Sequence, residues 1–97
     1  MPDNQVTLAH TVASVDDSNT VVVVAAPNRK YLRIRNTHPT ISVWLVVDGA
    51  GVVNTGIKLL AGETFEMTRA KNNIDPSAVN GIGSAAGPAV VLVTQAV

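Results

Sequence analysis

The stretch Tyr31-Leu32-Arg33-Ile34-Arg35-Asn36 decides the fold class of this 97-residue chain. Its apolar and polar side chains alternate residue by residue, which is the period of a β-strand and not of a helix. In an extended strand Tyr31, Arg33 and Arg35 share one face, and the intervening leucine and isoleucine share the other. The stretch therefore predicts a strand with an apolar face toward a core and a basic face outward.

Strand-like segments recur on both sides of this stretch. Before it, residues 5–15 alternate, and residues 20–26 form an apolar run that we expect to be covered on both faces. After it, Ile41–Val47 alternates again, and the short connection around Pro39 predicts a hairpin with Tyr31–Asn36. Further strands are expected at residues 57–60, 64–68 and 89–97.

The segments between these strands carry turn signals. Residues 16–19 read Asp-Asp-Ser-Asn, and a longer loop runs from Asp48 to Gly56. Asp75 and Pro76 predict one helical turn, with the aspartate as its N-cap. Residues 81–88, rich in glycine and alanine, read as a flexible connection. The pattern predicts an all-β chain, a single jelly-roll-like β-sandwich domain over residues 1–97 with about seven or eight short strands.

The composition limits the classes of partner. Only 14% of the residues are charged and 46% are apolar, whereas an average soluble domain is roughly 25% charged. Such a surface favours contact with another protein. Seven basic and seven acidic residues cancel, which disfavours nucleic acid as a partner. The apolar run at residues 21–27 is too short to span a bilayer, and the amino terminus lacks signal-peptide features, so we expect synthesis in the cytoplasm and no membrane partner.

No group of residues predicts catalysis, a cofactor or a metal. The absence of cysteine excludes thiolate chemistry and disulfides. His10 and His38 lie on different segments without nearby carboxylates, and the Asp-Asp-Ser-Asn turn lacks the glycine and distal glutamate of a calcium loop. Glu63 and Glu66 fall on opposite faces of an extended strand, which argues against a paired-carboxylate site. We therefore expect a protein that is not an enzyme.

The candidate partner-interface residues are Tyr31, Arg33, Arg35 and Trp44. Tyrosine, tryptophan and arginine are enriched in interface hot spots. The alternative for the two arginines is a solvated face with weak salt bridges to Glu66 or Asp48. The alternative for Trp44, the single tryptophan, is a place in the core.

The chain from Arg29 onward resembles a group of phage proteins. It has a basic-apolar strand ending in Asn36, a second apolar strand, a Gly56-Ile57-Lys58-Leu59-Leu60-Ala61-Gly62 turn and a glycine-rich approach to a last strand. This cadence is similar to that of small β-sandwich virion structural proteins of tailed bacteriophages, of the capsid decoration (cement) or head-fibre base type.

The resemblance implies a non-enzymatic subunit of the virion. Such a subunit decorates or stabilises the capsid by assembling with itself, commonly as a homotrimer, and by contacting the major capsid protein or another virion protein. Two alternatives stay open: a tail, baseplate or fibre-attachment component, and a carbohydrate-binding β-sandwich module. The sequence offers few aromatic residues for a sugar platform, which makes the second alternative weaker.

Overall fold

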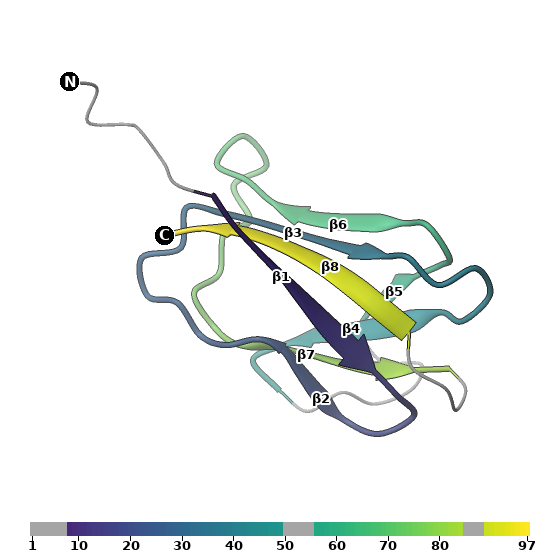
Figure 1. Cartoon of the computed structure of the whole chain (residues 1–97). Helices are drawn as coiled ribbons and strands as arrows, with labels where there is room; N and C mark the ends of the chain where they lie inside the picture. Colours follow the sequence, from purple (N-terminus) through teal and green to yellow (C-terminus); the bar gives the residue numbers. More distant parts are fainter. Residues whose placement is uncertain (1–7, 50–55, 85–88) are drawn as a thin grey trace.

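The computed structural model describes residues 8–49, 56–84 and 89–97, which form eight strands and no helix (Figure 1). The strands are β1 (Leu8–Val15), β2 (Thr20–Val23), β3 (Tyr31–Asn36), β4 (Val43–Val47), β5 (Ile57–Leu59), β6 (Thr64–Met67), β7 (Val79–Gly83) and β8 (Ala89–Ala96).

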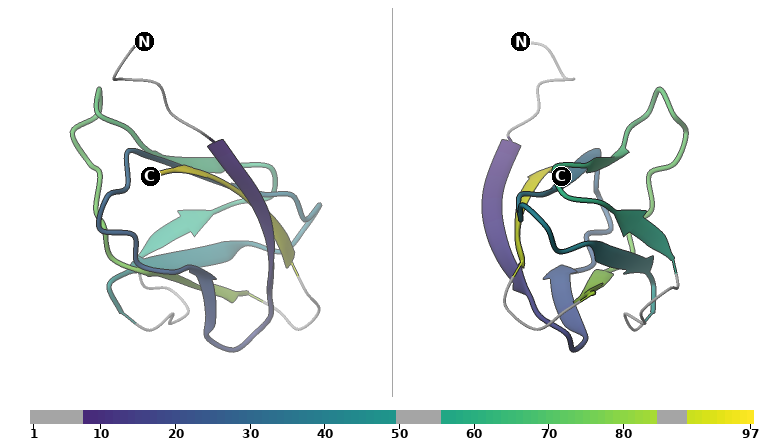
Figure 2. Two further views of the ribbon diagram at one scale, coloured as in Figure 1. Left: turned by 60° about the vertical axis from the view of Figure 1, so that its left-hand side comes forward. Right: turned by 90° about the vertical axis from the view of Figure 1, so that its right-hand side faces the viewer.

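The strands make two antiparallel sheets that face each other (Figure 2). The strand order is β1-β8-β3-β6 in one sheet, called here the β1 sheet, and β2-β7-β4-β5 in the other, the β2 sheet. Among the eight described strands, only β4 and β5 are sequence neighbours that pair; every other connection passes from one sheet to the other. This is the order of a jelly roll, in which two Greek keys are interleaved. The predicted all-β, jelly-roll-like sandwich is confirmed.

The core lies between the two sheets. The alternation in β3 buries Leu32 and Ile34 completely, and the same period in β8 buries Val91 and Val93. Burial of each such side chain contributes roughly 1.5–3 kcal/mol. The β2 sheet contributes the facing side chains, among them Val43, Leu45 and Val79.

The predicted hairpin between Tyr31–Asn36 and the following strand is wrong, because β3 and β4 belong to different sheets. The connection is a corner held by polar groups. The buried Asn36 amide donates to the Ile41 carbonyl at 2.8 Å, and His38 Nδ1 accepts from the backbone N–H groups of Thr40 at 3.0 Å and Ile41 at 2.8 Å. These bonds turn the chain across the sandwich.

Two expectations for the β2 sheet are also wrong. The apolar run at residues 20–26 is not covered on both faces: β2 ends at Val23, and Val21 and Val24 are 52% and 67% exposed. Residues 81–83 belong to β7 and are not a flexible connection. A Cβ on Gly81 would come within 2.9 Å of Val22 Cγ2, so this glycine reflects close packing inside the sandwich.

The helical turn expected at Asp75–Pro76 does not form. Asp75 Oδ1 does accept a hydrogen bond from Ser77 N at 2.8 Å. The carbonyl oxygens of Asp75 and Ser77, however, accept hydrogen bonds from Arg29 Nη1, so they do not begin the hydrogen-bond ladder of a helix. Parts of other predicted segments, at residues 5–7, 50–55 and 85–88, lie outside the described residues.

Candidate functional site

The candidate site is the outer face of the β1 sheet. Along β3, Leu32 and Ile34 point into the core, so Tyr31, Arg33 and Arg35 project outward. The prediction that these three residues share one face is confirmed. Arg33 and Arg35 are exposed and Tyr31 is half-buried.

The register of the β1 sheet arranges this face in rows. Opposite residues of antiparallel strands point to the same side, with their Cβ atoms about 4.5–5.5 Å apart. One row crosses all four strands and consists of His10, Thr94, Arg33 and Glu66. The next row consists of Val12, Leu92, Arg35 and Thr64. A polar row therefore lies beside a row that is apolar on β1 and β8.

A groove of about 820 Å³ runs over the polar row and its neighbours. Lys30, Arg33 and Arg69 supply its cationic groups. Its apolar part comes from Leu8, Val12 and Leu92, and His10 and Tyr31 also line it. No aspartate or glutamate lines this groove among the residues that the structure describes. The groove therefore fits a surface that offers both apolar and anionic groups.

Tyr31, Glu66 and Lys71 form a hydrogen-bonded cluster at the border of the groove. The Tyr31 hydroxyl donates to Glu66 Oε2 at 2.7 Å, and Lys71 Nζ lies 3.6 Å from Glu66 Oε1. The hydrogen bond with Glu66 raises the pKa of Tyr31. The same bond, helped by Lys71, lowers the pKa of Glu66. Within the described part of the chain this is the single ion pair, so neither Arg33 nor Arg35 forms the predicted salt bridge with Glu66 or Asp48 there. Both arginines are exposed, and the charge of Arg33 also helps to lower the pKa of Glu66.

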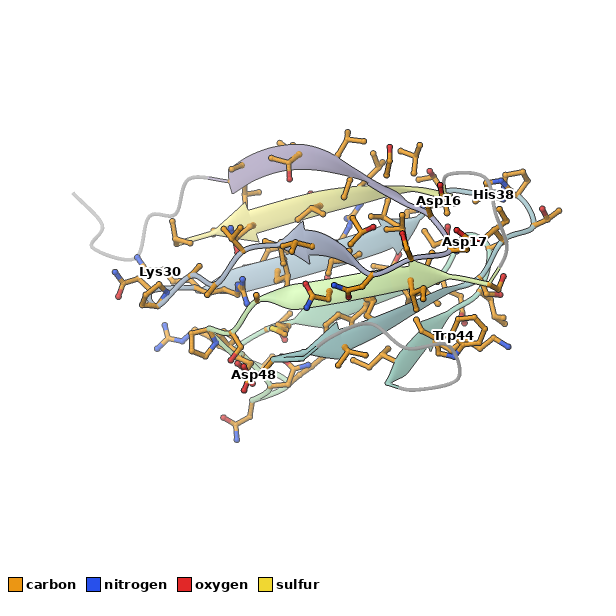
Figure 3. The ribbon with its side chains drawn as sticks, turned by 90° about the horizontal axis from the view of Figure 1, so that it is seen from below. Asp16, Asp17, Lys30, His38, Trp44 and Asp48 are labelled. Atoms are coloured by element: carbon orange, nitrogen blue, oxygen red, sulfur yellow. The ribbon has the colours of Figure 1, made fainter. Side chains whose placement is uncertain are left out.

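Trp44 does not join this surface. It lies in β4, between Val43 and Leu45, whose side chains enter the core, and it pairs with Lys58 of β5 and Ile82 of β7. Trp44 is buried, with Lys58 Nζ 5.2 Å from the centre of its ring. In Figure 3 it lies on the side of the sandwich away from β1. The four candidate residues therefore divide between two faces, three on the β1 sheet and one on the β2 sheet.

Arg29 is a buried residue whose role the sequence did not reveal. Its Nε donates to Gln95 Oε1 at 2.7 Å, Nη1 to the carbonyls of Asp75 at 2.5 Å and Ser77 at 2.9 Å, and Nη2 to the Val24 carbonyl at 2.9 Å. Burial lowers the pKa of Arg29, and the Asp75 carboxylate partly opposes that effect. The residue joins two loops and β8, which is a structural role.

The two histidines make ordinary structural contacts. His10 Nδ1 lies 3.0 Å from Thr94 Oγ1 on the outer face, and His38 caps the corner after β3. Among the described residues, no three of the histidines, aspartates and glutamates lie close enough to hold a metal ion. The structure also contains, within its described ranges, no helix that is long and apolar enough to cross a membrane.

Comparison of the chain with protein-family models, with curated protein sequences and with solved structures found no match.

Proposed function

We propose that this protein is a non-enzymatic structural subunit of a tailed-phage virion, and that it binds virion proteins through the outer face of the β1 sheet. Three features support the proposal: the jelly-roll topology, the charge-poor composition and the sequence cadence that resembles capsid-decorating phage proteins. Jelly rolls are common in viral capsid domains, although a fold alone does not determine a function.

The observation that carries the proposal is the apolar surface on the outer face of the β1 sheet. The outer faces of antiparallel sandwiches are normally polar because they meet water. On this sheet the outward positions of β1 and β8 instead include four exposed apolar side chains: Leu8, Val12, Val90 and Leu92. Apolar side chains gathered on one face mark a surface that another protein covers.

The neighbouring cations give this face its specificity. Arg33, Arg35 and Lys30 are exposed beside the apolar positions, so a partner with carboxylates around an apolar centre is complementary to the face. A capsid surface is the leading location, and a tail or baseplate site needs the same kind of contact. A carbohydrate is a less favoured ligand, because sugar sites usually offer exposed aromatic platforms. Among the described residues that line the groove, Tyr31 is the one tyrosine, phenylalanine or tryptophan, and its hydroxyl donates to Glu66.

Analysis of purified phage particles tests the proposal. Mass spectrometry of virions produced from a phage genome that carries this sequence is expected to find the protein in many copies. The variant Leu92→Glu, which places a carboxylate in the apolar part of the face, is expected to be depleted from particles at equal expression. Lys58→Glu on the β2 sheet is the control and is expected to be retained. Absence of the wild-type protein from particles would refute the proposal.

A further inference from the structure

We propose that β1 is a self-association edge, which pairs antiparallel with β1 of a second copy of this chain about a two-fold axis. The pairing would join two β1 sheets into one eight-stranded sheet. The inference rests on the proposed role as a virion subunit and deepens it by naming a strand that makes a contact and a second copy as the partner. It gives a two-fold pair in place of the homotrimer that the resemblance implies.

The first observation is the length and regularity of this edge. β1 pairs with β8 over all eight of its residues, from Leu8 opposite Ala96 to Val15 opposite Ala89, without a bulge. Its other side pairs with no strand in the described chain. In the right-hand view of Figure 2, β1 lies at the outer margin of the sandwich. A row of backbone N–H and C=O groups is therefore available to another strand.

The second observation is that the other three edges are protected and β1 is not. Natural sheets block edge pairing with short strands, charged side chains, prolines and bulges. β6 has four residues and includes Glu66, β5 has three and includes Lys58, and β2 has four with an irregular register between Val21 and Val23. β1 is at least twice as long as any of these and contains no lysine, arginine, aspartate, glutamate or proline. Among the four edge strands of the described sheets, β1 is thus the one that lacks this protection.

The third observation favours a second copy as the occupant. Pairing about a two-fold axis places each residue near its own counterpart, so a charged strand would repel itself. β1 carries no such charge, and six of its eight side chains are exposed. Opposite residues must point to the same side, so even-numbered positions oppose even-numbered ones. The register that places Val12 opposite Val12 joins this apolar side chain, which is 65% exposed, to its counterpart in the second copy. It also puts His10 opposite Ser14.

Light scattering across a concentration series tests the inference. The wild-type mass is expected to rise toward twice the 10.1 kDa of the single chain. Val12→Lys, at a position that is 65% exposed, opposes two ammonium groups at the axis and is expected to raise the dissociation constant at least about tenfold. The matched control is Leu92→Lys, because Leu92 is directly opposite Val12 on β8, points to the same side and is 43% exposed. It is expected to change the dissociation constant by less than about threefold.

Cross-linking supplies a second measurement. The chain has no cysteine, so Val12→Cys introduces a single thiol, and oxidation is expected to give a disulfide-linked dimer. His10→Cys, two residues away on the same side, is expected not to cross-link. A monomer or a trimer at all concentrations would overturn the inference, as would equal weakening by the two lysine variants, because that result would assign the contact to the sheet face. These results leave the particle analysis unaffected, so failure of the edge and failure of the virion role are distinguishable.

Discussion

Replacing Arg29 by methionine tests whether one buried guanidinium holds the loops at one end of the sandwich. The side chain is 5% exposed and its donors reach three backbone carbonyls and the side chain of Gln95. Methionine has a similar length and fills much of the same space, but it cannot donate. The substitution therefore removes the hydrogen bonds while keeping most of the packing.

The expected loss in the free energy of unfolding follows from the four hydrogen-bond acceptors that lose their donor. A typical hydrogen bond contributes about 1 kcal/mol net, and one from a charged donor contributes more, so about 4 kcal/mol is a moderate sum. Water can reach part of this peripheral site, which reduces the expected loss to about 3 kcal/mol. A domain of this length has roughly 5–15 kcal/mol of stability in total. The melting temperature is expected to fall by about 12–24 °C.

Urea unfolding, monitored by Trp44 fluorescence at constant protein concentration, measures the change in the free energy of unfolding. Arg29→Lys keeps the charge but not the planar set of donors, and is expected to lose about half as much stability. Arg35→Met removes an exposed arginine from β3 and is expected to change stability by less than about 0.5 kcal/mol. If Arg29→Met unfolds within about 1 kcal/mol of the wild type, the account of Arg29 as the tie between the loops is wrong.

Two further predictions concern the turn glycines and the outer face of the β1 sheet. Gly56 has φ +89° and a Cβ there would clash with the Leu45 carbonyl oxygen, whereas Gly62 has φ +79° and a Cβ there would have no neighbour within 4 Å. By urea unfolding, Gly62→Ala is expected to cost about 1 kcal/mol and Gly56→Ala at least about twice that; equal losses would contradict the clash. The lowered pKa of Glu66 and the raised pKa of Tyr31 predict a pH-dependent stabilisation by their hydrogen bond. It is present between the ordinary pKa values of the two groups, and lost as the pH falls through the folded-state value of Glu66 or rises through that of Tyr31. The difference in melting temperature between wild type and Tyr31→Phe should therefore be largest near neutral pH; a difference that stays constant to pH 2 would exclude this linkage.

Strand β3 is predictable from the sequence because one of its faces is wholly buried and the other is wholly polar. β8 is predictable because residues 90–93 are an unbroken run of valine and leucine, in which Val91 and Val93 face the core. Pairing is not predictable in the same way. A two-residue period says which side chains share a face, and it does not say which sheet receives the strand. The expected hairpin fails for this reason, since the corner that separates β3 from β4 depends on the buried amide of Asn36.

The same limit applies to β7 and to the candidate site. Glycine usually marks a turn, yet Gly81 lies inside a strand because Val22 leaves no room for a side chain. Alternation correctly groups Tyr31, Arg33 and Arg35, which share one strand. Trp44 comes from another strand, and only the three-dimensional order of the sheets shows that it lies on the other side. Arg29 is hidden from the sequence because three of its four acceptors are backbone carbonyls, which every residue carries.

The jelly-roll order has a consequence for the time course of folding. β1 precedes the other described strands in the chain and its partner β8 (residues 89–96) follows all of them, so this ladder, the longest among the described strands, cannot begin until the other six strands have been synthesised. At roughly 5–20 residues per second on the ribosome, β1 waits unpaired for about 4–16 seconds. Among the described strands, β4 and β5 are the only sequence neighbours that pair within one sheet. Such non-local topologies fold slowly, in milliseconds to seconds. During that time the uncharged β1 edge is open to pairing with other chains.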